Sequence, residues 1–152
     1  MIIDSTFLKR FLHHRKFDKE EAERTIINYI KARRENPLCY QKLNIDDTAV
    51  LELIQRGYIF PLMEKDSGGH TVIMFRNEAF SYYKYGNLGT DLFRAIVMTF
   101  EHLLCDEDNQ KKGFVYIVDF KGSCLSEVMK VRSLLKTLLK ATPVDQIFNL
   151  CS

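Results

Sequence analysis

The sequence has no long hydrophobic run and no N-terminal stretch typical of a secretory signal peptide. The longest apolar run is Phe114 to Val118, far short of the roughly 20 residues that a membrane-spanning helix needs. Met1-Ile2-Ile3 meets Asp4 at once, which leaves no room for the apolar core of a signal peptide. We therefore expect a cytoplasmic protein that can touch a membrane without crossing it.

The cysteines show neither a CxxC pair nor the spacing of a zinc site. We interpret all four as reduced thiols: Cys39, Cys105, Cys124 and Cys151. His102 and Cys105 lie three residues apart on an expected helix, but two ligands do not make a metal site. The sequence therefore predicts neither a metal nor a cofactor.

The common catalytic motifs are missing as well: the chain has no GxSxG, no GxxxxGK[ST] and no HExxH. Gly68-Gly69 is interpreted as a turn rather than a phosphate cradle. Asp119 ends an expected strand, where open α/β sheets place functional groups. It has no base or nucleophile beside it in sequence, which favours a structural hydrogen bond. No catalytic residue is predicted.

The formal net charge of +2 is too small to indicate nucleic-acid binding. The charge is unevenly distributed, however. Residues 1–34 hold nine Lys and Arg against five Asp and Glu, a net charge of +4, so the rest of the chain sums to −2. A basic N-terminal segment fits two interpretations: a surface for an anionic membrane, or simply a solvated helix face.

Three helices are expected in the first 57 residues. Apolar residues recur at helical spacing from Phe7 to Leu12, after the capping residues Asp4-Ser5-Thr6. A second helix is expected to begin at Asp18, with Glu21 placed as in a capping box, and to end at Asn36-Pro37. A third is expected from Asp47 to Arg56, with Gly57 suited to its C-terminal end.

An α/β pattern follows these helices. Residues 58–64 and 70–76 flank a glycine turn and predict a hairpin, in which Pro61 places the first strand at a sheet edge or a bulge. A helix capped by Thr90 or Asp91 is expected to reach about Cys105, followed by a polar loop at 106–113. Residues 114–120 predict a strand covered on both faces. A further amphipathic helix is expected at 126–139. The helix between strands implies parallel pairing.

Several segments, taken in order, resemble motifs of the CRAL-TRIO family. The run FLKRFLHHRKFD resembles the FLxRFLRARKFD segment that opens the family's helical part, and NYIKARRENP resembles its NYxxxRxExP helix end. DSGGHTV matches the D-x-x-G-x-x-V pattern of its hairpin. GFVYIVDFKG resembles its G-[IV]-x-x-[IV]-x-D-x-x-G strand. The resemblance covers about residues 5 to 140. It is strongest to the subgroup of the α-tocopherol transfer and retinaldehyde-binding proteins.

The resemblance implies a fold class and a division of the chain. The fold would be α/β, with a small N-terminal helical subdomain at residues 1–57. The first part of a CRAL-TRIO mixed sheet flanked by helices would occupy residues 58–152, as an incomplete lipid-binding domain. The family continues at both ends beyond the matching segments, and no counterpart is found after Lys140. We therefore expect a form truncated at both ends.

The resemblance also implies a function, which is non-catalytic binding and transfer of a small hydrophobic lipid between membranes. The ligand would be tocopherol-like, retinoid-like or phosphoinositide-like. The implied lipid-binding residues lie on one helix, one strand and the segment after it: Phe93, Ile96, Val97, Phe100, Phe114, Tyr116, Val118 and Leu125. Tyr116 would orient a ligand hydroxyl, and Arg33 would contact a phosphoinositide during transient docking on an anionic membrane. The alternative for each apolar residue is ordinary core packing.

Two competing functions stay open at the level of sequence. The chain could act as a protein-interaction module that self-associates through its unfinished sheet without carrying lipid, because a partly exposed apolar strand favours association. An unrecognised enzyme would need a cluster of polar groups around Asp119, which the sequence does not indicate.

Overall fold

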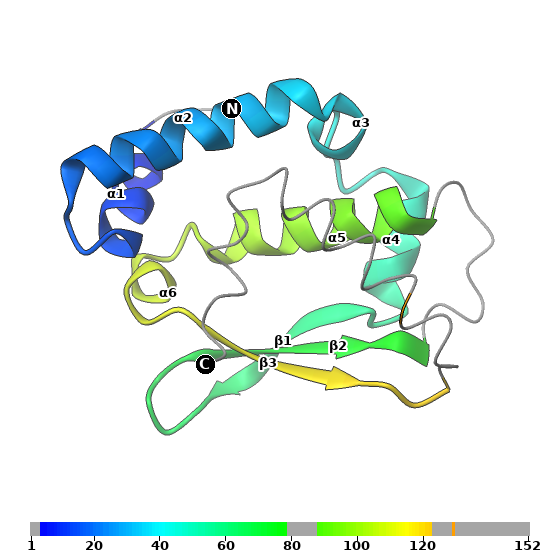
Figure 1. Cartoon of the computed structure of the whole chain (residues 1–152). Coiled ribbons are helices and arrows are strands. Elements are labelled where there is room, and N and C mark those ends of the chain that lie inside the picture. Colours follow the sequence, from blue (N-terminus) through cyan, green and yellow to red (C-terminus); the bar gives the residue numbers. More distant parts are fainter. Residues whose placement is uncertain (1–3, 79–87, 123–128, 130–152) are drawn as a thin grey trace.

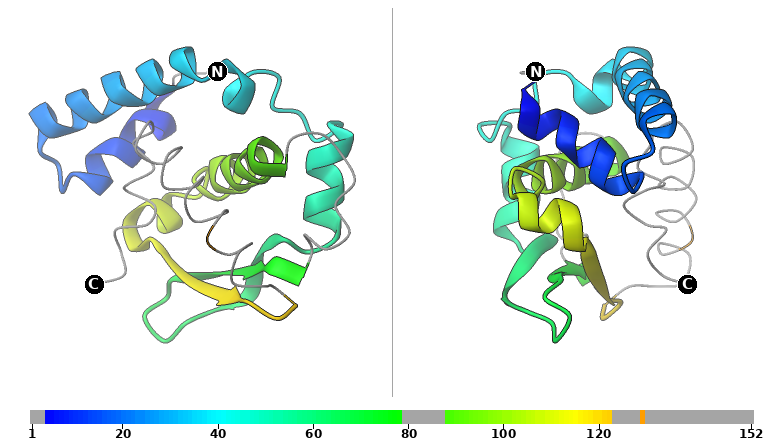
Figure 2. Two further views of the ribbon diagram at one scale, coloured as in Figure 1. Left: turned by 45° about the vertical axis from the view of Figure 1, so that its right-hand side comes forward. Right: turned by 90° about the vertical axis from the view of Figure 1, so that its left-hand side faces the viewer.

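The computed structural model describes residues 4–78, 88–122 and 129 of the chain. Within these residues, helices lie over one face of a three-stranded sheet formed in the order β1 (Ile59–Lys65), β2 (Thr71–Arg76) and β3 (Phe114–Asp119). The long helix α5 (Leu88–Leu103) runs along that face, and the first helices of the chain lie beyond it (Figure 1). Figure 2 shows the same layering from two further directions.

The N-terminal part contains four helices, and aspartates cap three of them. These are α1 (Ser5–His14), α2 (Lys19–Glu35), α3 (Pro37–Tyr40) and α4 (Thr48–Gln55). Asp4, Asp18 and Asp47 each accept a hydrogen bond from a backbone N–H of the first turn that follows, which satisfies a donor that the helix itself leaves free. The three predicted helices are confirmed. The single turn α3 was not predicted; it begins on Pro37, whose fixed φ suits a first helical position.

The predicted hairpin is confirmed as β1 (Ile59–Lys65) and β2 (Thr71–Arg76), paired antiparallel. Pro61 lies on the edge strand β1, and the register shifts between Pro61 and Lys65, as expected for a residue that cannot donate to the ladder. Strand β3 (Phe114–Asp119) runs parallel to β2, with Thr71 opposite Phe114. The predicted parallel pairing is therefore confirmed.

Two boundaries differ from the sequence prediction. Helix α5 (Leu88–Leu103) begins before Thr90 and Asp91, so neither residue is its cap. The predicted loop at 106–113 contains the short helix α6 (Glu107–Lys112), which Asp106 caps by accepting from the Asp108 N–H at 2.8 Å. This helix carries no apolar stripe, so hydrophobic periodicity could not reveal it. The predicted helix at 126–139 lies outside the described residues, apart from Met129.

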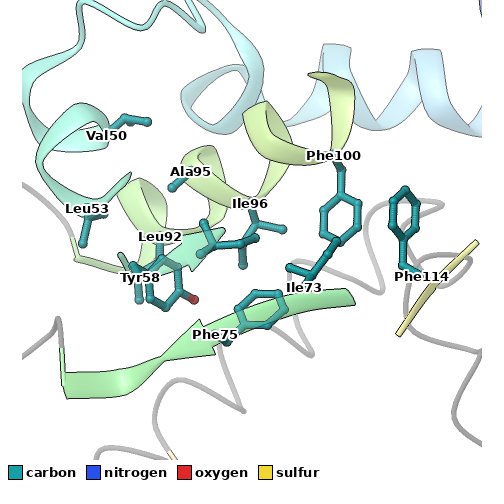
Figure 3. Close-up of a cluster of buried hydrophobic side chains, with 11 residues drawn as sticks. Val50, Leu53, Tyr58, Ile73, Phe75, Leu92, Ala95, Ile96, Phe100 and Phe114 are labelled. Atoms are coloured by element: carbon teal, nitrogen blue, oxygen red, sulfur yellow. The ribbon is translucent and has the colours of Figure 1, made fainter. Parts of the chain in front are cut away.

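The main core lies between α5, α4 and the sheet (Figure 3). Ile96 and Phe100 of α5 face β2 and β3, and the ring of Phe100 meets that of Phe114 edge-on, with centroids 5.2 Å apart. Val50 and Leu53 of α4 are fully buried in the same cluster. Helices α1 and α2 have a smaller cluster of their own around Phe7, Phe11 and Ala22. The division at residue 57 thus places α4 with the N-terminal helices in sequence, although it packs with the sheet.

Strand β3 is less covered than its sequence suggests. Phe114 is buried, but Ile117 and Val118 are 43% and 44% exposed, and Phe120 after the strand is also exposed. In the described part of the chain β3 is an edge strand. The expectation of cover on both faces is therefore wrong for the second half of the strand. Composition alone cannot separate a strand buried along its whole length from one whose end is uncovered.

Candidate functional site

A partly open cavity of about 360 Å³ lies among α1, α2, α5, α6 and the start of β3. This volume is at the lower end of the roughly 300–1,000 Å³ found for small-molecule sites. Most of its exposed lining is apolar. The apolar and aromatic side chains of this wall are Phe11, Tyr29, Tyr40, Ile96, Val97, Phe100, Leu104 and Phe114.

Helix α5 supplies the centre of the apolar wall. Ile96, Phe100 and Leu104 follow one another at four-residue spacing, so they form a stripe along one side of the helix. Val97 lies beside this stripe and packs with Phe93, Cys39 and Tyr40. The same helical face therefore serves both the core and the cavity.

The other end of the cavity is charged, because Glu101 interacts there with two helices from the N-terminal part. Arg10 Nη1 of α1 donates to Glu101 Oε2 at 2.9 Å, and Arg33 Nη2 of α2 donates to Oε1 at 2.6 Å. The Tyr29 hydroxyl donates to Oε1 at 2.5 Å. This Glu101 cluster, which consists of Arg10, Tyr29, Arg33 and Glu101, joins α1 and α2 to α5.

Aromatic rings support both guanidinium groups of the Glu101 cluster. The Arg10 guanidinium lies 4.1 Å from the Phe7 ring centroid, and that of Arg33 lies 4.5 Å from the Tyr29 centroid. Such stacking attracts a cation to the negative face of the ring. The rings therefore fix the two guanidinium groups beside the carboxylate.

The protonation states in this cluster follow from burial and charge. Burial disfavours ionisation of Glu101, but Arg10, the Tyr29 hydroxyl and Arg33 together outweigh it and lower the pKa of the carboxyl. Burial and the neighbouring Glu101 carboxylate raise the pKa of Tyr29. At neutral pH, Glu101 is therefore ionised and Tyr29 is a neutral donor.

A second buried arginine, Arg94 of α5, holds the segment between α2 and α4. Its Nη1 donates to the Leu38 and Gln41 carbonyls, and its Nη2 donates to the Lys42 carbonyl and to Asp47 Oδ2, at 2.8–3.1 Å. Arg94 is not among the described residues that line the cavity. Its contacts are those of a structural clasp.

The structure brings four of the sequence-predicted lipid-binding residues together on the cavity wall: Ile96, Val97, Phe100 and Phe114. The others lie elsewhere. Phe93 is buried against Cys39 and Tyr40, and Tyr116 packs against the rings of Phe75 and Phe100. Val118 is exposed near the end of β3. Leu125 lies outside the described residues.

The predicted phosphoinositide contact, Arg33, has a side chain only 19% exposed, and its guanidinium is occupied by Glu101. Sequence reasoning missed Glu101, Arg10 and the α6 residues of the cavity. The only available signal was Tyr29 and Arg33 at four-residue spacing on α2, which marks a polar stripe on one helix. No sequence rule connects them to a carboxylate 68 residues from Arg33.

The thiols and potential metal ligands form no cluster in the part of the chain that the structure describes. Cys39 is buried and Cys105 is exposed, and both are free thiols. Among the described residues, no three His, Cys, Asp or Glu side chains gather as metal ligands would. Cys124 and Cys151 lie outside the described residues. In the same ranges, no helix combines the length and the apolar character needed to cross a bilayer.

Comparison with known proteins points to one family. The profile of the CRAL/TRIO domain matches residues 55–144. The chain is 33% identical over 125 residues to a Homo sapiens protein named "Alpha-tocopherol transfer protein-like". The matched region covers 82% of the chain and 35% of that protein. The chain is 28% identical over 128 residues to clavesin-1 of Xenopus laevis, covering 84% and 38%. The chain thus spans little more than a third of the length of these relatives.

Proposed function

The chain belongs to the CRAL/TRIO domain family, and from that premise we propose that it binds a small hydrophobic lipid non-covalently and transfers it between membranes. One relative carries tocopherol transfer in its name. Lipid carriage requires no reaction chemistry, only an apolar space with a few placed polar groups. The proposed role is that of a carrier without catalytic activity.

The observation that carries this proposal is the apolar wall of the cavity. Ile96, Val97 and Phe100 from α5 meet Phe114 from β3 around it. These side chains are already buried in the chain, so the gain comes mainly from the tail's own apolar surface, which contributes about 25 cal/mol for each Å² removed from water. Phe93, Tyr116 and Val118 complete the proposed set, together with Leu125, which lies outside the described residues.

Membrane contact is the second part of the proposal. Residues 1–34 carry a net charge of +4, and basic residues near an anionic leaflet gain roughly 1 kcal/mol each. Arg33 would contact a phosphoinositide by exchanging Glu101 for a phosphate, because Glu101 occupies its Nη2 in the structure. We place the protein in the cytoplasm, with transient docking on anionic membranes.

A second candidate function has its own observation. Ile117, Val118 and Phe120 expose apolar surface at the edge of the described sheet. An uncovered apolar edge strand is a template for pairing with another chain. The alternative is therefore an interaction module that dimerises through β3 without carrying lipid.

Native mass spectrometry of the purified 152-residue chain, followed by organic extraction, tests both candidates. A stoichiometric lipid on the monomer supports the carrier. An empty chain that runs as a dimer, and becomes monomeric when Val118 is changed to Lys, supports the interaction module instead.

A pair of substitutions locates the lipid. Val97→Phe places a ring in the cavity and is expected to abolish lipid retention. Ile27→Phe makes the same kind of change on the exposed side of α2 and is expected to leave retention unchanged. Equal retention in the two variants would place the lipid outside this cavity. Val118→Phe then asks whether the bound lipid extends to the end of β3.

A further inference from the structure

Three residues that line the cavity have polar atoms that are buried without a partner in the described part of the chain. They are Arg10 Nη2, His13 Nδ1 and Gln110 Oε1, and all three residues line the cavity. The side chains of Arg10 and His13 are only 9% and 8% exposed, and Gln110 as a residue is 8% exposed. A buried polar atom without a partner costs free energy. Arg10 Nη2 is a charged donor and therefore indicates an acceptor in this cavity, whereas Gln110 Oε1 is itself an acceptor.

These residues lie along a single seam, because α6 is bound to α1. Gln110 Nε2 donates to the Thr6 carbonyl at 3.2 Å and to the Leu104 carbonyl at 2.8 Å. Arg10 and His13 follow Thr6 at four and seven residues, on the same face of α1. Since both Gln110 N–H bonds are used, its amide orientation is fixed and Oε1 is an acceptor without a donor.

The charges around the cavity favour an anion. Among the described lining residues, Arg10, Lys16, Lys111 and Lys112 stand against one carboxylate, that of Glu101. Glu107 and Asp108 of α6 partly neutralise Lys111 and Lys112, at 3.2 and 3.6 Å, and Glu107 also lies 4.0 Å from His13 Nε2. Lys16 has no ion pair among the described residues. Glu101 leaves Arg10 Nη2 unoccupied, so Arg10 has a donor to spare.

We propose that the ligand is an amphiphile with a single oxyanion head, either a carboxylate or a phosphate, and that the head is bound between α1 and α6 by Arg10, His13 and Lys16. Its tail lies along the apolar wall of α5 and β3. This rests on the proposed lipid-carrier function and selects a ligand class within it. A hydroxyl oxygen can also accept from Arg10 Nη2, but a carboxylate or phosphate oxygen accepts from it in a charge-assisted hydrogen bond, which is roughly twice as strong.

Three probes with the same sixteen-carbon tail test the proposal on the unmodified chain: hexadecanoate, hexadecyl phosphate and hexadecanol. Affinities are measured below the concentrations at which each probe aggregates. We expect both anions to bind at least about tenfold more tightly than the alcohol, because only they accept from the buried guanidinium in a charge-assisted hydrogen bond. Acetate and inorganic phosphate, which lack the tail, are expected to bind far more weakly. The ratio of the two anions identifies the head as carboxylate or phosphate.

Arg10→Met is expected to remove the preference for the anions and leave hexadecanol affinity within about twofold, since it deletes the charge and keeps most of the apolar stem. Arg94→Met is the matched control, because Arg94 is buried to the same degree and is not among the described cavity residues. Lys16→Met is an exposed rim substitution that should weaken only the anions, by about threefold. It provides the same test if either buried variant fails to fold.

Several outcomes would overturn the inference. If hexadecanol binds as tightly as the anions, ordered water satisfies the buried polar groups of the cavity. The chain could then still carry lipid, but it would not select an anionic head group. Tail-less inorganic phosphate binding as tightly as hexadecyl phosphate would reveal a simple anion site. If none of the three lipids binds, both the inference and the proposed carrier function fail.

Discussion

Arg94 and Arg10 are buried to the same degree, with side chains 8% and 9% exposed, but their guanidinium groups are satisfied differently. Arg94 donates four hydrogen bonds, three of them to backbone carbonyls of the segment that joins α2 to α4. Among the described residues Arg10 donates to Glu101 alone and keeps Nη2 without a partner, and it lines the cavity. Arginine at equal burial thus serves two purposes in this chain.

The difference shows how a structural cation is distinguished from one available to a ligand. A buried guanidinium whose donors are all used has no N–H group left to bind a ligand, so its removal affects only the stability of the fold. A guanidinium with a spare donor beside a cavity holds hydrogen-bonding capacity that the protein itself does not use. Burial alone would have given the same description of both residues.

The largest expected loss of stability is at Arg94, whose guanidinium donates four hydrogen bonds. Arg94→Met leaves the Leu38, Gln41 and Lys42 carbonyls and the Asp47 carboxylate without their donor. We expect the free energy of unfolding to fall by about 3–5 kcal/mol, the range for breaking a buried pair from one side. Urea denaturation followed by circular dichroism measures it. A loss below about 1 kcal/mol would mean that water replaces the hydrogen bonds of Arg94. Arg94 would then not be the structural arginine that its contrast with Arg10 requires.

The next largest effect is expected at the centre of the Glu101 cluster. Glu101→Gln leaves Arg10 and Arg33 without their carboxylate, and the free energy of unfolding should fall by about 2–3 kcal/mol, less than for Arg94 because the carboxylate is partly exposed. Chemical denaturation provides the measurement, with Glu35→Gln on α2, whose side chain is 57% exposed, as a surface control. If the two variants lose equal stability, Glu101 does not join α1 and α2 to α5.

Acid should weaken the Glu101 cluster without any substitution. The folded-state pKa of Glu101 is lowered from the ordinary value of 4.5. Its ionised form therefore stabilises the fold above pH 4.5, and this contribution is lost as the pH falls from 4.5 through the lowered pKa. Denaturation midpoints across that interval should decrease with acid in the unmodified chain. The same decrease in Glu101→Gln would assign the effect to other carboxylates, such as Asp66, Glu107 or Asp108.

The smallest effect is expected at an exposed arginine. Arg24 pairs with Glu21 at 3.0 Å, one helical turn away on α2, and their side chains are 70% and 40% exposed. Exposed pairs of this kind contribute roughly 0.3–0.5 kcal/mol, so Arg24→Met should lower the free energy of unfolding by no more than about that amount. Parallel denaturation of Arg94→Met and Arg24→Met gives the full scale of the comparison. A loss at Arg24 close to that at Arg94 would show that burial does not set the ranking.

The sequence anticipated most of the elements, because their signals are local. Asp18 and Glu21 marked the start of α2, Asn36-Pro37 marked its end, and the glycine turn at 68–69 marked the hairpin. The sequence did not reveal α6, which has no apolar stripe. It also predicted that β3 is buried on both faces, whereas Ile117 and Val118 are exposed. In the candidate site it anticipated Ile96, Val97, Phe100 and Phe114 as neighbours, although the assignment of lipid binding to them remains a prediction.

The sequence by itself determined the order of helices and strands, the parallel pairing of β2 and β3, and the family. Each of these depends on caps, turns, periodicity or motifs that lie in contiguous residues. Only the tertiary structure decided which polar side chains meet. Arg10 and Glu101 are 91 residues apart, and α1 and α6 share a seam through Gln110 and Thr6. Contacts of this kind depend on how separate helices pack, and helical periodicity states which face of a helix is buried but not which partner covers it.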